Sequence, residues 1–112
     1  MVEEKRRYIR GDNKVRVTYS LGEEDEFSEG VFTENISEVG LQIIIENRIE
    51  QNQVLQLKLE FMSDSVPIIA DCRVVYVKPE SNQHRIGLEF INMDNFQKQR
   101  LKRCLEEARK DS

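Results

Sequence analysis

Two short motifs carry the side chains best suited to binding chemistry. The first is a basic run near the N-terminus, in which Arg6 and Arg10 form an R-x-x-x-R pattern. The second is Asn35-x-Ser37-x-x-Gly40, which follows the general pattern D/N-x-S-x-x-G. A chain of this composition carries about one R-x-x-x-R by chance, but only roughly 0.03 copies of the second pattern. The second motif is therefore the more informative of the two.

The residue types of the second motif suit a polar ligand. Side chains alternate along a strand, so Asn35 and Ser37 should share one face while Ile36 points to the other. An amide offers donors and an acceptor, and a hydroxyl can donate to a phosphate oxygen. Gly40 would allow a turn with positive φ or a close approach of a ligand to the backbone. The alternative is an ordinary strand-end turn, in which Asn35 and Ser37 cap local backbone groups.

The composition predicts one globular domain with a well-solvated surface. The chain has 112 residues, of which 38% are hydrophobic and 34% charged, and its net charge is −4. Nucleic-acid-binding domains are usually basic, so DNA and RNA are not expected as partners. Cations nevertheless dominate from Lys5 to Arg16, and anions dominate from Glu23 to Glu29. This pattern suits a small anionic ligand, although two solvated charged loops that attract each other would produce it as well.

Cysteine and histidine usage predicts no metal site, no cofactor and no catalytic centre. Cys72 and Cys104 lie far apart and match no metal spacing, and His84 has no second ligand near it in sequence. We expect both cysteines to be buried thiols in a reducing cytoplasm. No apolar run approaches the ~20 residues of a membrane span, and no signal peptide is seen, so we expect a cytoplasmic protein without membrane insertion.

Hydrophobic alternation predicts six strands and one helix. The predicted strands cover residues 14–20, 30–37, 40–46, 53–62, 67–76 and 85–91. Pro67 is expected to open the fifth strand, with Tyr76 on its inner face. After residue 92 the period changes to 3.6, which predicts an amphipathic C-terminal helix with Asp94 or Asn95 as its N-cap.

These elements predict a mainly β fold. Six strands with short connections and one apolar face tend to close into a small antiparallel barrel, which the helix would cover. We expect a flexible N-terminal tail over residues 1–13, the barrel over residues 14–92 and the helix over residues 93–110, all in a single domain.

The order of the motifs resembles the PilZ domain family. In this family R-x-x-x-R precedes a strand, and D/N-x-S-x-x-G follows about 25 residues later, as it does here. Residues 85–90 (Arg-Ile-Gly-Leu-Glu-Phe) look like the last barrel strand, and residues 74–76 (Val-Val-Tyr) like the strand before it. The resemblance covers nearly the whole chain. It implies a six-stranded split barrel that serves as a bacterial receptor for cyclic di-GMP.

The resemblance also implies roles for the motif residues. Arg6 and Arg10 would contact phosphates and stack on guanine or hydrogen-bond to it, as a planar guanidinium fork allows. Asn35 would read a guanine edge. Ser37 would hold a phosphate or a nearby group, and Gly40 would shape the turn.

Three further positions bear on affinity and stoichiometry. Lys5 and Arg7 flank the first arginine and are candidates for additional contacts. In the family, neighbours of that arginine can influence whether one ligand or an intercalated pair binds. The family often has Asp at the position of Asn35, and an aspartate can accept from two guanine N–H groups. The affinity that an asparagine supports stays open.

We expect a receptor whose Arg-rich tail orders on cyclic di-GMP and then presents a new surface to a partner protein in trans. Ordering costs roughly 1–2 kcal/mol per residue and each charge-assisted bond contributes roughly 1.5–3 kcal/mol, so both motifs must engage together. The main alternative is a PilZ-like interaction module that binds no nucleotide. An RNA-binding barrel and an enzyme are weaker alternatives, since Ser37 has no identified base. Monomer and homodimer are both open.

Overall fold

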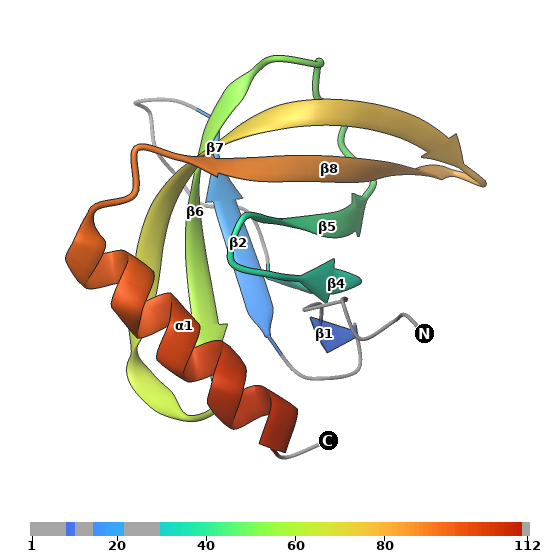
Figure 1. Ribbon diagram of the computed structural model, residues 1–112. Coiled ribbons are helices and arrows are strands. Elements are labelled where there is room, and N and C mark those ends of the chain that lie inside the picture. The colour runs from blue at the N-terminus through green and yellow to red at the C-terminus, as the bar shows by residue number, and fades with distance from the viewer. Residues whose placement is uncertain (1–8, 11–14, 22–29, 111–112) are drawn as a thin grey trace, which may run out of the picture.

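The structure of the chain is a computed structural model that describes residues 9–10, 15–21 and 30–110. These residues form one antiparallel sheet of eight strands and one helix (Figure 1). The strands are β1 (Ile9–Arg10), β2 (Arg16–Ser20), β3 (Val31–Phe32), β4 (Asn35–Ile36), β5 (Gly40–Ile45), β6 (Val54–Phe61), β7 (Asp64–Glu80) and β8 (Gln83–Ile91). The helix is α1 (Asn95–Lys110), and the strand order is β1-β4-β5-β8-β7-β6-β2-β3.

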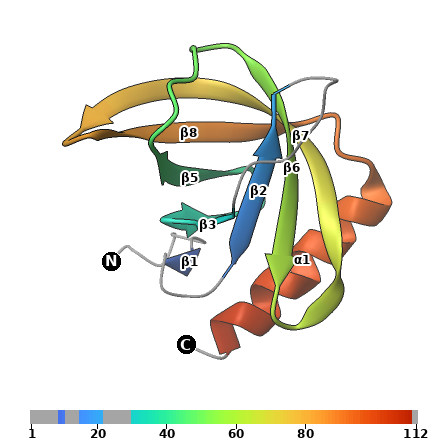
Figure 2. The same cartoon turned by 180° about the vertical axis from the view of Figure 1, so that it is seen from behind.

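The sheet curls so that its two ends approach each other. β3 and β4 follow one another in the chain, yet β3 pairs with β2 at one end of the sheet and β4 pairs with β5 near the other. Only Thr33 and Glu34 join them, a link that spans about 11 Å at most. Thr33 N–H donates to the carbonyl of Val15 (3.1 Å), and Glu34 N–H donates to the carbonyl of Gln42 (2.8 Å). This crossing closes the sheet into a half-barrel (Figures 1 and 2).

The inner face of the curled sheet forms the hydrophobic core. In β6 the residues Leu55, Leu57 and Leu59 are almost fully buried, while the residues between them face outward. Residues of β2, β5, β7, β8 and α1 join the same cluster. Burial of one aliphatic side chain contributes about 1.5–3 kcal/mol, so this cluster is the main source of stability.

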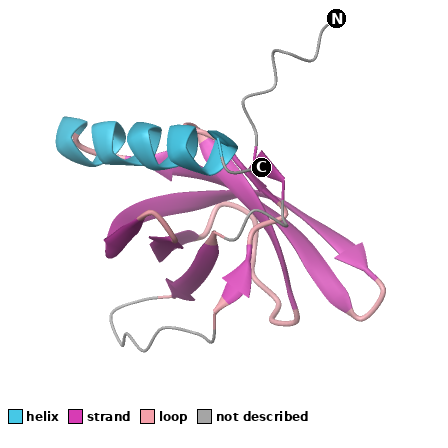
Figure 3. Ribbon diagram, turned by 90° about the horizontal axis from the view of Figure 1, so that it is seen from below, coloured by secondary structure: helices cyan, strands magenta, loops and turns pink. Residues whose placement is uncertain are grey.

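α1 covers one side of the half-barrel. It begins after Asp94, whose Oδ1 accepts a hydrogen bond from Gln97 N–H (2.8 Å), as an N-cap residue does. Leu101, Cys104 and Leu105 repeat at helical spacing and are buried in the core. The helix lies against β7 and next to β1, and Figure 3 shows it along one side of the sheet.

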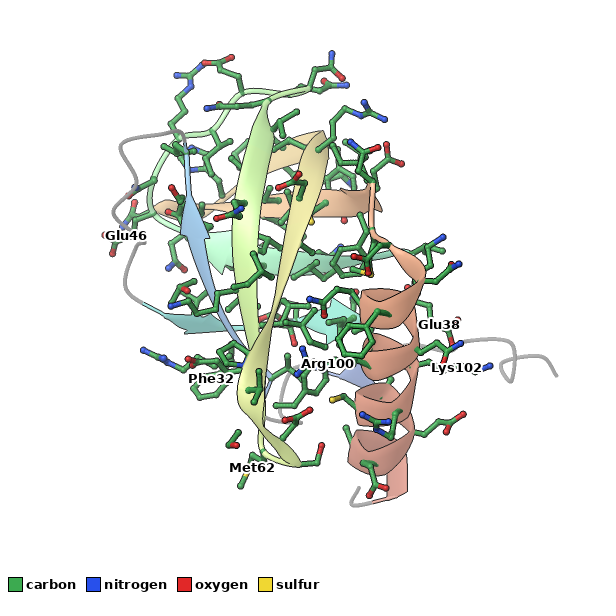
Figure 4. All side chains as sticks on the ribbon, turned by 90° about the vertical axis from the view of Figure 1, so that its left-hand side faces the viewer. Phe32, Glu38, Glu46, Met62, Arg100 and Lys102 are labelled. Atoms are coloured by element: carbon green, nitrogen blue, oxygen red, sulfur yellow. The ribbon has the colours of Figure 1, made fainter. Side chains whose placement is uncertain are left out.

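Arg100 connects α1 to the hairpin formed by β6 and β7. Its buried guanidinium donates to Asp64 Oδ2 (3.1 Å), to the carbonyl of Pro67 (3.4 Å) and to the carbonyl of Val66. Figure 4 shows Arg100 pointing from α1 toward the strands, whereas Lys102 points away. One charged side chain of the helix thus holds the beginning of β7.

The predicted mainly β fold with a C-terminal helix is confirmed, but the strand count differs. The strand predicted over residues 30–37 is divided into β3 and β4, because its two halves pair with different neighbours. The strand expected to open at Pro67 begins at Asp64.

Part of the predicted tail is described by the structure. Ile9 and Arg10 form β1, which pairs with β4. The other residues of the tail and the acidic run at 23–29 lie outside the described residues. The division into a tail (1–13), a barrel (14–92) and a helix (93–110) stays a prediction.

Candidate functional site

The D/N-x-S-x-x-G motif lines an open pocket on the outer face of the sheet. Asn35 lies in β4, Ser37 lies in the turn that follows, and Gly40 begins β5. The pocket has a volume of about 450 Å³. Its lining comes from β4, β5, β7, β8 and the β4–β5 turn, namely Asn35, Ser37, Val39, Gly40, Leu41, Gln42, Val75, Tyr76, Gly87, Leu88 and Glu89.

The first motif reaches this site through β1. The antiparallel pairing of β1 with β4 places Arg10 directly opposite Asn35, and Ile9 directly opposite Ile36. The backbone therefore brings one residue of each motif to neighbouring positions. The remaining residues predicted from the basic run, Lys5, Arg6 and Arg7, lie outside the described residues.

Ser37 caps the turn between β4 and β5. Its hydroxyl donates to the carbonyl of Gly40 (3.4 Å) and accepts a hydrogen bond from Val39 N–H (3.2 Å). The backbone N–H of Ser37 donates to the same carbonyl (2.9 Å). Ser37 is buried. In this structure Ser37 therefore caps local backbone groups, which is the alternative to ligand binding that the sequence left open.

Gly40 is required by close packing of two strands. A Cβ atom at this position would lie 2.1 Å from the carbonyl oxygen of Leu88 in β8. A main-chain atom in a paired strand cannot move aside as the end of a flexible side chain can. None of the described glycines has a positive φ, so of the two alternatives raised for Gly40 the positive-φ turn does not apply. Because Gly40 has no side chain, β8 can pack directly beside β5 at this position.

A β-bulge in β7 directs two successive side chains into the pocket. The register with β8 shifts between Val74 and Tyr76. Val74 is fully buried, whereas Val75 and Tyr76 both line the outer pocket, and Val77 again packs against the core. A bulge adds one residue and so inverts the alternation beyond it. The prediction that Tyr76 lies on the inner face is therefore wrong.

Gly87 makes room for the ring of Tyr76. A Cβ atom at Gly87 would lie 2.2 Å from Tyr76 Cε2, so the ring lies directly over the glycine. From this position the hydroxyl of Tyr76 accepts a hydrogen bond from Gln42 Nε2. Lys78 Nζ lies 5.0 Å from the centroid of the same ring. The ring is thus held in place along one wall of the pocket.

A single row of paired residues crosses five strands at the site. The row runs from β1 to β7 through Arg10, Asn35, Gln42, Gly87 and Tyr76. Gln42 stands at its centre and is hydrogen-bonded to the side chains of both Asn35 and Tyr76. The row therefore connects Arg10 and Asn35, one residue of each motif, to Tyr76, which the bulge in β7 turns toward the pocket.

Two ion pairs border the pocket. Arg85 donates through Nε and Nη2 to the two carboxylate oxygens of Glu80, both at 2.7 Å. This hydrogen bonding lowers the pKa of Glu80 and raises that of Arg85. On the other side, Arg73 Nη2 lies 2.7 Å from Glu89 Oε2.

Sequence reasoning missed Gln42, Tyr76 and Arg85. Only Gln42 had a signal in the sequence: a tight turn over residues 37–40 pairs position 35 with position 42, as the structure shows. Tyr76 and Arg85 come to the site from β7 and β8, which lie far from the motif in sequence. Their positions depend on the bulge and on strand pairing.

The described residues hold no group of three or more His, Cys, Asp or Glu side chains that could bind a metal ion. Cys72 and Cys104 are free and buried, and burial raises the pKa of both thiols.

In the part of the chain that the structure describes, no helix is both long and apolar enough to cross a membrane.

Comparisons with known proteins identify the fold. No curated protein shows significant sequence similarity to the chain. Among solved structures, the Bacillus subtilis inhibitor of motility (MotI/DgrA) shares 19% identity with a TM-score of 0.67, covering 96% of this chain and 53% of that one. Escherichia coli YcgR in complex with c-di-GMP shares 10% identity with a TM-score of 0.72, covering 93% and 45%.

A shorter structure matches over almost its whole length. The PilZ domain of YcgR with c-di-GMP shares 12% identity with a TM-score of 0.70, covering 96% of this chain and 93% of that one. The chain thus spans about half the length of MotI and of the longer YcgR chain. The sequence profile of the PilZ domain matches residues 4–107. Since this match includes both motifs and almost every described element, the chain belongs to the PilZ domain family.

Proposed function

We propose that this chain is a receptor for cyclic di-GMP whose Arg-rich N-terminal segment orders over the bound ligand. The observation that carries the proposal is the pairing of β1 with β4, in which Arg10 lies directly opposite Asn35. The c-di-GMP complexes of YcgR, whose PilZ domain shares this fold, support the choice of ligand. We place the ligand in the pocket beside β4, β5 and β7.

Each motif would make a different kind of contact. Arg6 and Arg10 would bind phosphates and guanine, because a guanidinium both donates hydrogen bonds and stacks. Asn35 would accept from a guanine edge. Lys5 and Arg7 are candidates for further phosphate contacts.

Ser37 would need to exchange a hydrogen bond in order to hold a phosphate. A hydroxyl has one hydrogen to donate, and Ser37 directs it to the carbonyl of Gly40. At 3.4 Å this bond is longer than the usual range for hydroxyl donors, so its exchange for a phosphate oxygen would cost little. Gly40 would contribute by letting β5 approach β8.

Ordering of the N-terminal segment would convert ligand binding into a signal. The ordered segment would lie beside β4 and α1, since β1 already contacts both, and would present a new surface to a partner protein in trans. We propose a binding role without catalysis, in the cytoplasm, as a monomer or homodimer. The second candidate function is an interaction module that binds no nucleotide.

Calorimetric titration of cyclic di-GMP, with GTP as the control ligand, tests the proposal. We expect micromolar or tighter binding to the wild type, and the stoichiometry will give one or two ligands per chain. Arg10→Ala should weaken binding by about tenfold or more, because hydrogen bonds to charged groups contribute about 1.5–3 kcal/mol. Arg48→Ala is the matched control, since Arg48 is exposed and pairs only loosely with Glu50 (3.9 Å).

Two results would reject the receptor. The first is no heat and no thermal stabilisation at high ligand concentration, which would favour the interaction module. The second is equal loss of affinity in Arg10→Ala and Arg48→Ala, which would indicate unspecific attraction of the dianion.

A further inference from the structure

The carboxamide of Asn35 is held in one of its two possible orientations. An asparagine can present either its oxygen or its NH2 group to a pocket, and the two have opposite hydrogen-bonding needs. Here Asn35 Nδ2 donates to Gln42 Oε1 (3.3 Å). Among the described residues none donates a hydrogen bond to Asn35 Oδ1, so this acceptor is left for a ligand.

Gln42 determines this orientation because its own amide cannot turn over. Gln42 Oε1 also accepts from Arg85 Nη1 (2.8 Å), and a guanidinium has only donors. The opposite end of the amide, Nε2, donates to the hydroxyl of Tyr76. If Gln42 were turned over, its NH2 group would face the N–H groups of both Arg85 and Asn35. Gln42 Oε1 must therefore face Asn35, and Asn35 must direct its NH2 group toward this oxygen.

Arg85 is held in turn by Glu80. The two hydrogen bonds between them are bidentate, the arrangement in which a guanidinium and a carboxylate fix each other most firmly. The side chains of Arg85 and Glu80 are 27% and 41% exposed, so solvent screens the charges of the pair and the two-bond geometry is what fixes the guanidinium. A continuous chain of hydrogen bonds thus runs from Glu80 through Arg85 and Gln42 to Asn35.

We propose that Glu80, Arg85 and Gln42 are positioning residues that hold Asn35 Oδ1 toward the ligand as an acceptor, and that this selects guanine over adenine. The inference rests on the proposed function, because it concerns the base that this pocket reads. The Watson–Crick edge of guanine offers the donors N1–H and N2–H2. Adenine offers one donor, N6–H2, beside the acceptor N1.

The fixed orientation of the Asn35 carboxamide is what favours guanine over adenine. An asparagine binds adenine best through a bidentate contact in which its oxygen accepts and its NH2 group donates. Gln42 takes one of the two hydrogens of this NH2 group and fixes the direction of the carboxamide, so the NH2 group cannot turn freely to make the donating half of this contact. The oxygen of Asn35 stays available to N1–H or N2–H2 of guanine, as an aspartate oxygen would be, which explains how an asparagine can occupy this motif position in a guanine site.

Parallel titrations of cyclic di-GMP and cyclic di-AMP test the inference. The wild type should prefer cyclic di-GMP. Gln42→Leu frees the Asn35 carboxamide to turn over, so the preference should fall by about tenfold, the size of one good bidentate base contact. Gln42→Glu should keep the preference, because its carboxylate can still accept from both Arg85 and Asn35. Gln56→Leu is the matched control, as Gln56 is exposed in β6 outside the pocket.

The outcomes separate this inference from the receptor function. If Gln42→Leu keeps the wild-type preference, or if the wild type binds both dinucleotides equally, the positioning role is wrong and the receptor stands. If the wild type binds neither dinucleotide, the proposed receptor function is wrong, and the proposed selection of guanine is wrong as well. The orientation itself is measured without ligand, by NMR exchange of the Asn35 side-chain NH2 protons. Equal exchange rates in the wild type and in Gln42→Leu would overturn it.

Discussion

At Gly40 the strands β5 and β8 come so close that any side chain would collide with main chain. Ser37, three residues earlier, uses its hydroxyl to cap the turn that leads into β5. Two of the three motif residues thus have a structural task in the ligand-free protein. Ser37 caps the turn that places Asn35 opposite Gln42, Gly40 allows β5 to pack against β8, and Asn35 is the motif residue with neither task.

Gly40→Ala should therefore destabilise the ligand-free protein. Forcing a methyl group against the carbonyl of Leu88 should cost about 1–3 kcal/mol, as overpacking usually does. The measurement is the free energy of unfolding from urea denaturation. Gly30→Ala is the control, since the three atoms nearest to its added methyl group belong to the guanidinium of Arg16, which lies at the end of a flexible side chain. Equal unfolding free energies for the two variants would show that β5 can move away from β8 at no cost.

The β6–β7 hairpin and α1 are joined by a carboxylate and a guanidinium. Asp64 Oδ1 accepts from Val66 N–H (3.0 Å) within the hairpin, and Oδ2 accepts from Arg100 of the helix (3.1 Å). The Val66 N–H and the Arg100 guanidinium lower the pKa of Asp64 below its ordinary value of 3.8. The ionised carboxylate therefore stabilises the fold above that value, and the contribution is lost as the pH falls through the lowered pKa.

Asp64→Asn should consequently be less stable than the wild type at pH 7, and the difference should shrink as the pH falls below about 4. Thermal unfolding between pH 2 and pH 7 measures this. Asp94→Asn is the matched control, because asparagine caps a helix about as well as aspartate. A difference between Asp64→Asn and the wild type that stays constant over this range would show that the charge of Asp64 does not hold Arg100.

In the molecule as a whole, the hydrophobic core and the proposed ligand site lie on opposite faces of one sheet. The inner face carries the core, and the outer face carries the pocket lined by Asn35, Gln42 and Tyr76. Some strands contribute to only one of the two. β6, for example, has residues in the core and none in the pocket. We therefore expect that a change in the β6 part of the core alters stability without altering the site.

Leu57→Ala tests this separation. Leu57 is fully buried in β6, so truncation should cost about 2–5 kcal/mol of unfolding free energy. Affinity for cyclic di-GMP, measured at a temperature where the variant is folded, should stay at the wild-type value. Gln56→Ala, one residue earlier on the outer face, should change stability by less than about 0.5 kcal/mol. A large loss of affinity in folded Leu57→Ala would show that the core and the pocket are coupled.

The sequence alone determined the features that depend on neighbouring residues. Alternation over residues 53–62 predicted β6, the change of period after residue 92 predicted α1, and the spacing of the motifs predicted the PilZ family. Each signal is contained within one segment or in the order of segments. Such signals can be read without knowing which strands meet, and they were sufficient for the mainly β fold with a C-terminal helix.

Only the tertiary structure decided how the segments meet. The division of residues 30–37 between β3 and β4, the pairing of Arg10 with Asn35 and the bulge before Tyr76 all depend on strand pairing. The bond from Gln42 to Tyr76 joins residues 34 positions apart. Register is set by contacts between distant segments, and one extra residue in a strand reverses every face beyond it. Local patterns in the sequence therefore located the motif, whereas the register of the sheet decided which other side chains surround it.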